Sequence, residues 1–442
     1  MLTRKIKNFI SRFFQSNATG PLRIPAQTHG INRRHVSRHA IKVCEVLQEK
    51  GYEAYIVGGA VRDLLVGIQP KDFDVATNAT PEQIRPLFRR AHIIGRRFKL
   101  VHVVFGREVI ETSTFRAAST RRTTTDEHGR ILRDNVYGNL KEDAERRDFT
   151  LNALYYDPIT QEVIDFHQGV RDLQNNVVRI IGDAATRYRE DPVRMLRAIR
   201  FAAKLDATIE PQTHQPIAKL AHLLDNVPTS RRFDEAIKLL SCGQAIPCLQ
   251  KLEQENLIQH ILPVFPALYA QPENALFLDL AFERTDQRVR TGQPISPSFL
   301  FAALLWPLVR EQWAAEQKKG TPVVQAMADA CTTVLETEAP KMAIQRRIQA
   351  DMREIWFSQA RFQRISNRAI WRLLEQPRFR AAVDFLQLRA AAKELDSVEA
   401  QWWMDLADAD AQKRSELIAE RRPRRQGKRR RRRPARQRSS EA

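Results

Sequence analysis

The stretch that decides the fold reads AYIVGGAVRDLL at residues 54–65 and KDFDV at residues 71–75. An apolar run that ends in Gly58-Gly59 and precedes a helical pattern predicts a strand, a tight turn and the start of a helix. Backbone N–H groups in a turn of this kind can approach phosphate oxygens closely. The sequence therefore predicts a phosphate-binding turn at these two glycines.

Two aspartates follow the turn. In a strand, Asp72 and Asp74 would point to one face while Phe73 and Val75 face the core, because side chains alternate along a strand. Two neighbouring carboxylates beside a phosphate site are what paired Mg²⁺ ions require for phosphoryl or nucleotidyl transfer. An isolated Asp-x-Asp is also common at strand ends that bind no metal, so the interpretation depends on the remaining motifs.

The chain is strongly basic. Its 442 residues contain 72 Lys and Arg against 52 Asp and Glu, a net charge of +20. Residues 421–442 alone contain twelve Lys and Arg and one acidic residue, yet the remainder is also positively charged. This balance predicts a polyanionic partner. Because the sequence has no run of 18 apolar residues, we expect no membrane-spanning segment.

The cysteines have neither metal-ligand nor disulfide spacing. They form no C-x-x-C pair and have no companion histidines, so we expect buried thiols in a reducing compartment. The four residues are Cys44, Cys242, Cys248 and Cys331.

Residues 1–35 contain no acidic residue and begin with a basic amphipathic pattern. The apolar side chains at helical spacing are Ile6, Phe9, Ile10, Phe13 and Phe14, and the basic ones among them are Arg4, Lys5, Lys7 and Arg12. Such a helix is typical of peripheral contact with an anionic membrane surface, and its composition is typical of organellar transit peptides. A leader that packs on the first domain is the third interpretation.

Strand and helix signals alternate over residues 36–166, whereas helical periodicity dominates from about residue 183 to residue 419. Ser37 and the capping box that begins at Thr80 predict two helix starts in the first region. We therefore expect an α+β fold, in which a small mixed sheet with helices forms an N-terminal head. The polar stretch 117–139 is expected to be a long functional loop.

The expected organisation has five parts. Helices alone would form the neck and body, with the six tryptophans as core anchors. The boundaries are 1–35 for the N-terminal segment, 36–182 for the catalytic head, 183–245 for a neck that binds nucleotide and RNA, 246–419 for an RNA-binding body and 420–442 for a disordered Arg-rich tail.

Further polar residues accompany the aspartates. Glu111, in a β-rich run at 109–114, would complete a metal shell if its strand lies beside that of Asp74; alone, it reads as an edge-strand charge. Residues 146–153 read RRDFTLNA and offer donors for a triphosphate and a sugar, although a surface salt-bridge cluster would look the same.

A basic stripe follows at the start of the helical region. Asp191-Pro192 predicts a helix start, and Arg194, Arg197 and Arg200 recur along one side of that helix. Such a stripe is usually a solvated face, so the interpretation of these arginines as functional residues depends on the neighbouring motifs. A planar guanidinium suits both reading a base edge and holding phosphates.

Taken in order, these motifs resemble those of the class II nucleotidyltransferases, the superfamily of bacterial poly(A) polymerases and tRNA CCA-adding enzymes. The resemblance covers about residues 50–205. Its four motifs are Gly58-Gly59-x-x-Arg62-Asp63, Asp72-x-Asp74, Arg146-Arg147-Asp148-Phe149-Thr150-x-Asn152-Ala153 and Glu190-Asp191-Pro192-x-Arg194-x-x-Arg197-Ala198-x-Arg200-Phe201.

The resemblance implies roles for individual residues. Asp72 and Asp74 would hold two Mg²⁺ ions, with Mn²⁺ as a substitute, and Asp148 would lie with them in the catalytic site. On the strand-pairing argument above, Glu111 is a further catalytic candidate. Asp191 and Arg194 would read the base. The full set expected to bind ATP is Gly58, Gly59, Arg62, Arg147, Asn152, Asp191, Arg194, Arg197 and Arg200.

Within the superfamily, three features favour the poly(A) polymerases. The stretch 94–103 resembles the corresponding segment of the polymerases. In CCA-adding enzymes a glycine follows the phenylalanine of this segment. No His-Asp dipeptide occurs, so the phosphohydrolase domain of many long CCA-adding enzymes is missing. The arginine-rich C-terminus is typical of the bacterial polymerases.

The implied activity is template-independent addition of AMP from ATP to RNA 3′ ends, with release of pyrophosphate. A tRNA CCA-adding or A-adding enzyme is the alternative. We expect a cytoplasmic monomer that acts on mRNA or small RNA in RNA processing and decay and does not act on DNA. Peripheral membrane contact through the N-terminal helix stays open.

Overall fold

A computed structural model describes residues 20–95, 99–117, 124–125, 131–133, 136–363 and 366–421. The chain divides into two compact units. The first runs to Ala275 and includes Phe282–Leu300 and Thr337–Gln345; the second comprises Leu276–Ala281, Phe301–Glu336 and the described residues from Arg346 onward. The expected amphipathic helix at the N-terminus and the Arg-rich tail lie outside the described residues, except for Glu420 and Arg421 at the start of the tail.

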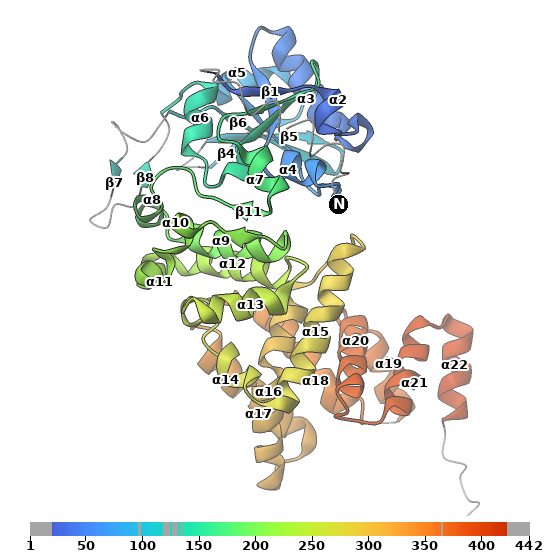
Figure 1. The fold of residues 1–442 in the computed structure, drawn as a ribbon. Helices are drawn as coiled ribbons and strands as arrows, with labels where there is room; N and C mark the ends of the chain where they lie inside the picture. Colours follow the sequence, from blue (N-terminus) through green and yellow to red (C-terminus); the bar gives the residue numbers. More distant parts are fainter. Residues whose placement is uncertain are drawn as a thin grey trace, which may run out of the picture. The chain divides into compact units, whose positions relative to one another are not determined.

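The head is built on one mixed sheet of eight strands in the order β1-β10-β9-β2-β3-β6-β5-β4 (Figure 1). Within this sheet, β3 and β6 pair in parallel and every other neighbouring pair is antiparallel. The strands are β1 (Leu22–Ile24), β2 (Ala54–Val57), β3 (Asp74–Thr77), β4 (Ala91–Ile94), β5 (Leu100–Phe105), β6 (Glu108–Thr114), β9 (Leu154–Asp157) and β10 (Glu162–Asp165). The expected mixed sheet is confirmed, and β1 adds part of the N-terminal segment to it.

Short helices connect and cover the strands. Ser37 caps α3 by accepting hydrogen bonds from two backbone N–H groups, and Thr80 and Gln83 form the expected capping box, which confirms both predicted helix starts. The helices of the head are α2 (Ala26–His29), α3 (Arg38–Glu49), α4 (Gly59–Leu65), α5 (Pro81–Ile84), α6 (Leu140–Arg146) and α7 (Gly169–Gln174), with 3₁₀ helices η1 (Arg33–His35), η2 (Arg85–Leu87) and η3 (Thr150–Asn152).

The stretch 117–139, expected to be a loop, contains a small second sheet in its described part. Strands β7 (Thr124–Thr125) and β8 (Ile131–Arg133) pair antiparallel. A bridge between Arg116 and Tyr137 joins the two ends of the stretch. The expectation of a loop is therefore wrong for these residues. The stretch is polar and lacks the alternation of apolar and polar residues that predicts a strand.

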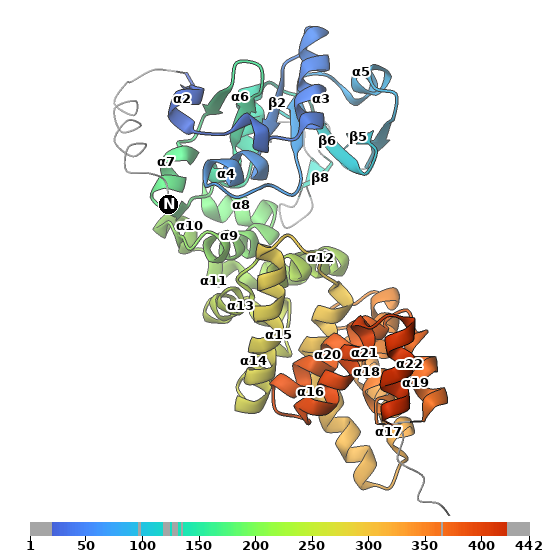
Figure 2. The same cartoon turned by 90° about the vertical axis from the view of Figure 1, so that its right-hand side faces the viewer.

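Among the described residues after residue 183, the regular elements are helices apart from one short strand. This strand, β12 (Thr208–Ile209), pairs in parallel with β11 (Val177–Val178). Helix α9 packs against α12 and α13 (Figure 2). The remaining helices are α8 (Ala184–Glu190), α9 (Val193–Lys204), α10 (Pro211–His214), α11 (Ile217–Leu220), η4 (Ala221–Asn226), α12 (Thr229–Leu240), α13 (Ala245–Gln254), η5 (Ile258–His260), α14 (Phe265–Tyr269), α15 (Pro272–Arg290), α16 (Pro297–Lys318), α17 (Val323–Glu338), α18 (Arg346–Arg361), α19 (Asn367–Leu374), α20 (Phe379–Ala391), α21 (Ser397–Asp408) and α22 (Ala411–Glu420).

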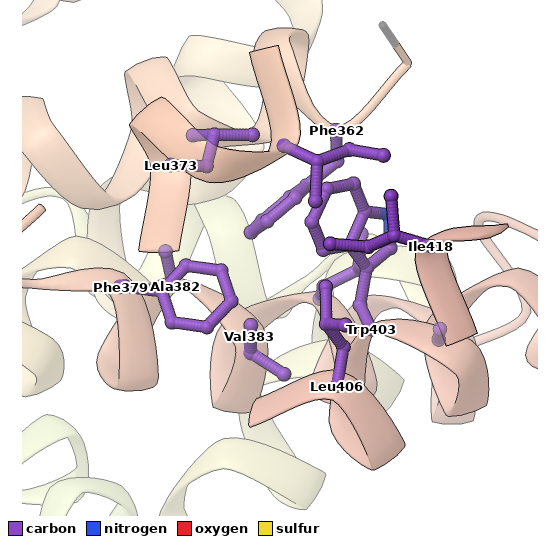
Figure 3. Packing of buried hydrophobic residues seen from close by; sticks show 11 residues of the cluster. Phe362, Leu373, Phe379, Ala382, Val383, Trp403, Leu406 and Ile418 are labelled. Atoms are coloured by element: carbon purple, nitrogen blue, oxygen red, sulfur yellow. The ribbon is translucent and has the colours of Figure 1, made fainter. Parts of the chain in front are cut away.

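Aromatic side chains form a core in the second unit. Trp403 of α21 is fully buried, and its ring lies 4.7 Å from Phe362 and 6.3 Å from Phe379, centroid to centroid (Figure 3). The expectation that every tryptophan is a core anchor is wrong for Trp371, which is 41% exposed. Its neighbour Ile370 faces the core, and consecutive positions on a helix point about 100° apart.

Two whole-chain expectations can be compared with the described residues. All four cysteines are free and buried, as expected. Across the described part of the chain, no helix is long and apolar enough to cross a membrane.

Candidate active site

Three carboxylates gather at one end of β3. Asp74 is the first residue of this strand and lies in register with Glu111 on β6, which confirms that the two strands are neighbours. Asp72 precedes the strand, and the alternation holds because Phe73 is 5% exposed and Val75 is fully buried. Burial, together with the negative charges of Glu111 and Asp72, raises the pKa of Asp74 to about 6. This end of the sheet therefore concentrates negative charge that a cation would neutralise.

The chemistry of these carboxylates fits a divalent cation completed by substrate. Within the described residues, no three His, Cys, Asp or Glu side chains are grouped to hold a metal by themselves. Mg²⁺ is usually bound in nucleotide-using enzymes by one or two carboxylates together with phosphate oxygens and water. Repulsion of Asp74 by Glu111 and Asp72 is expected in a site of this kind when no cation is bound.

The glycine turn lies close to an arginine and has a backbone conformation that favours glycine. Gly58 has φ of 77° and ψ of −130°, a conformation that strains any residue with a side chain. A Cβ atom placed there would lie 3.6 Å from Nη1 of Arg147. The Gly58 N–H donates to the carbonyl of Leu154 at 3.1 Å, so this amide serves the strand rather than a phosphate.

Arg147 is fixed beside the carboxylates at the end of α6. Its Nε donates to Asp143 at 3.1 Å and to the hydroxyl of Tyr155 at 2.9 Å, and that hydroxyl donates to Asp143 at 2.7 Å. The positive charge of Arg147 lowers the pKa of Asp74, an effect smaller than the raising effects of burial and Glu111. The arginine is thus held in place by protein groups while its field reaches the carboxylates.

A buried polar chain connects α4 to α9. Arg62, only 5% exposed, donates to Asp63 at 2.8 Å and to the Asn152 amide oxygen at 2.7 Å. Asn152 donates to Asp148 at 3.2 Å, and Asp148 accepts from Nε of Arg197 at 2.6 Å. Sequence analysis placed Arg62 on the nucleotide, whereas its guanidinium here faces protein partners and the ring of Phe201.

The charge state of Asp148 reflects these contacts. Burial alone would raise its pKa, but the charge of Arg197, the hydrogen bonds from Arg197 and Asn152 and the Phe149 N–H together lower the pKa to about 2. Asp148 is therefore a carboxylate at every physiological pH, and it ties α9 to the segment that follows α6.

A cavity of about 430 Å³ lies beside the hydrogen-bonded pair of Asp148 and Arg197. Asp191 accepts a hydrogen bond from Arg231 at 2.7 Å through Oδ2, whereas its buried Oδ1 has no partner among the described residues. Arg194 donates to Glu190 at 2.9 Å. The residues that line the cavity are Asp148, Asp191, Arg194, Arg197, Arg231, Asp234, Glu235 and Lys238.

The third arginine of the predicted stripe lies elsewhere. Arg200 is 3.8 Å from the buried carboxylate of Glu235, and burial lowers its pKa. It does not line the cavity. The stripe is therefore not a solvated face: its three members contact Glu190, Asp148 and Glu235 in turn.

Sequence analysis missed the contribution of α12 and of several arginines. Arg231, Asp234 and Lys238 line the cavity from 40 or more positions beyond Asp191, and no local motif marks them. Arg187 donates to the carbonyls of Arg146 and Arg147 at 2.6 and 2.7 Å. Burial and four neighbouring arginines lower the pKa of Arg146 to about 9, which marks a concentration of positive charge suited to phosphate.

A mixed sheet that presents carboxylates on adjacent strands, next to an arginine cluster and a polar cavity, defines a nucleotidyltransferase. The chain is 44% identical to poly(A) polymerase I of Salmonella typhi over 394 residues, covering 86% of this chain and 85% of the relative. It is 43% identical to poly(A) polymerase I of Haemophilus influenzae over 90% of both chains. The chain belongs to the bacterial poly(A) polymerase family.

Family models match three segments of the chain. Residues 54–179 match the poly A polymerase head domain, residues 206–268 a probable RNA and SrmB-binding site of polymerase A, and residues 319–437 the polymerase A arginine-rich C-terminus. A CCA-adding enzyme of Lactobacillus johnsonii is 36% identical, but over 58% of this chain.

Solved structures show the same fold. The CCA-adding enzyme of Bacillus stearothermophilus, solved with CTP, aligns with a TM-score of 0.55 at 24% identity, covering 86% of this chain and 82% of its own. The CCA-adding enzyme of Thermotoga maritima, solved with a tRNA, aligns with a TM-score of 0.51 at 19% identity, covering 90% of this chain and 98% of its own. These alignments confirm the expected head with a mostly helical remainder.

Proposed function

We propose that this nucleotidyltransferase adds AMP units from ATP to RNA 3′ ends without a template. The observation that carries the proposal is the register of Asp74 with Glu111 beside Asp72, next to a cluster of arginines. The name of the relatives that match most of the chain at 43–44% identity favours poly(A) synthesis over CCA addition.

The proposed reaction is an in-line displacement. The RNA 3′-oxygen forms a bond to the α-phosphorus of ATP, and the bond from that phosphorus to the bridging oxygen breaks to release pyrophosphate. Divalent cations held by Asp72 and Asp74, with Glu111 beside them, would lower the pKa of the attacking hydroxyl and neutralise the leaving charge. Arg147 and the arginine cluster attract and orient the triphosphate, so the protein acts through position and charge.

The cavity beside α9 is proposed to receive the base. Oδ1 of Asp191 is a buried acceptor without a partner among the described residues, and an exocyclic amine of a base would satisfy it. Arg194 supplies donors at the same cavity. Adenine and cytosine both carry such an amine, so this contact would accept either base. The preference for ATP over CTP therefore has to be measured.

The charge of the whole chain agrees with an RNA substrate. The chain has a net charge of +20. Contacts of Lys and Arg side chains with phosphates bind RNA largely without regard to its sequence. We propose action on mRNA or small RNA in the cytoplasm, where free thiols such as the four buried cysteines persist.

A single gel experiment tests the proposed function. Purified full-length protein with Mg²⁺ is given an unstructured RNA oligomer, or a tRNA that lacks its CCA end, with ATP alone, CTP alone or both. Long ladders with ATP on the generic oligomer and little product with CTP are expected. A three-nucleotide addition that is restricted to the tRNA and requires both nucleotides would instead assign CCA addition.

Removal of residues 422–442 is expected to weaken RNA binding. The deleted segment contains eleven Lys and Arg, and each phosphate contact that is lost reduces the slope of log Kd against log salt by about 0.7 for single strands. Fluorescence anisotropy with labelled RNA at several salt concentrations measures this slope, while the KM for ATP is expected to stay within about twofold. An unchanged slope would show that the segment does not contact RNA.

A further inference from the structure

A row of titratable side chains crosses four neighbouring strands of the head sheet. The strand register pairs Asp74 of β3 with Glu111 of β6, Glu111 with His102 of β5, and His102 with His92 of β4. Residues that face each other across paired strands direct their side chains to the same face of the sheet. The row therefore runs from the carboxylates of the site toward the sheet edge formed by β4.

His102 flanks Glu111 on the side opposite Asp74. Its Nε2 lies 3.6 Å from Oε1 of Glu111, and the side chains are 29% and 54% exposed, respectively. This separation exceeds hydrogen-bond length, but a small rotation of the exposed glutamate would close it. Side-chain bonds in a catalytic site are often long before substrate binds and tighten afterwards.

Glu111 needs an orienting partner. It sits between a carboxylate that repels it and an imidazole that can donate to it. Ligating carboxylates are in turn hydrogen-bonded in metal sites, and loss of such a partner typically weakens metal affinity or activity about 10- to 100-fold. No other element of the proposed function uses His102.

We propose that His102 is a positioning residue for Glu111: its Nε2–H donates to one carboxylate oxygen and leaves the other for the divalent cation. This inference rests on the proposed function, because Glu111 serves as a ligand only if these carboxylates hold the catalytic cation. Its role is orientation of the carboxylate, and contact with the RNA or ATP is not required.

The matched variants are His102→Gln and His102→Asn, which differ by one methylene. The glutamine amide nitrogen takes the place of Nε2 and the asparagine nitrogen that of Nδ1, so only glutamine reproduces the donor toward Glu111. His92→Leu, in the same row but one strand farther away, is the control. Thermal unfolding of each full-length variant verifies that it is folded.

Two measurements decide the proposal. Binding of Mn²⁺ to RNA-free protein, followed by the electron paramagnetic resonance signal of free Mn²⁺, is expected to weaken about tenfold in His102→Asn and by less than about twofold in His102→Gln and His92→Leu. Turnover at limiting Mg²⁺ is expected to follow the same order, with the KM for ATP within about twofold.

Equal Mn²⁺ affinity in His102→Asn and the wild type would overturn the proposal. Equal loss in the asparagine and glutamine variants would also overturn it, because a donor at Nε2 would then be irrelevant. Failure of the wild type to extend RNA would instead refute the proposed function, and the Mn²⁺ comparison would still decide the role of His102.

Discussion

Replacement of Asp74 by alanine is expected to reduce nucleotide incorporation by about 10³-fold or more, while RNA binding is retained. Asp74 is the first residue of β3, adjoins Glu111 in register, and lies where burial and neighbouring carboxylates raise its pKa to about 6. Its removal would delete a ligand of the proposed cation site and leave in place the arginines that are proposed to bind phosphate. Loss of one member of a catalytic group commonly costs several orders of magnitude in kcat.

Primer extension with ATP and fluorescence anisotropy with the same RNA measure the two effects separately. The control is Glu162→Ala on β10, which removes a carboxylate paired with Arg23 at 3.1 Å on a strand remote from β3 in the sheet order. It is expected to retain activity. A purified Asp72→Ala/Asp74→Ala double variant that still extends RNA would refute the assignment of these aspartates to the cation site.

Replacement of Asp148 by alanine is expected to destabilise the first unit by about 3–5 kcal/mol and to lower activity with it. The substitution leaves Arg197 without its carboxylate partner at 2.6 Å and removes the acceptor for Asn152. Breaking one side of a buried ion pair is costly because the other charge stays desolvated. Thermal or urea unfolding of the full chain, read from the transition of the first unit, gives the free energy.

The pH dependence supplies an internal check. The folded-state pKa of Asp148 is lowered to about 2 from an ordinary value of 3.8, so its stabilising contribution is fully present above about pH 4 and is lost as the pH falls toward 2. The difference between wild type and Asp148→Ala should shrink over that interval. In a double-mutant cycle with Arg197→Ala, the combined loss is expected to be smaller than the sum of the single losses.

The local geometry around Asp72 and Asp74 was predicted because its signals are local. The alternation of Asp72, Phe73, Asp74 and Val75 follows from the two-residue period of extended chain, and the structure reproduces it. The tight turn at Gly58, where φ is positive, was likewise signalled by a glycine pair between a strand and a helix. The sequence could state the pairing of β3 with β6 only as a condition. The register between strands that are distant in the chain depends on the packing of the whole sheet.

Other features depend on packing that the sequence does not contain. The motif predicts that Arg62 contacts nucleotide, and this stays a prediction; in the folded head Arg62 is 5% exposed and donates to Asp63 and Asn152. Trp371 reads as a core residue by its type, yet its position on α19 places it outside the buried face.

The sequence by itself determined the class of the head, the placement of Asp72 and Asp74 on the same side of an extended segment, and the mostly helical nature of the rest. These features depend on residue type and on spacings of two to four positions, which local backbone geometry converts directly into a shared face. Only the tertiary structure decided that Arg231 holds Asp191 across 40 residues, that Arg197 meets Asp148 across 49, and that His102 faces Glu111. Such contacts arise where separate elements pack together, and no short sequence pattern encodes which elements will meet.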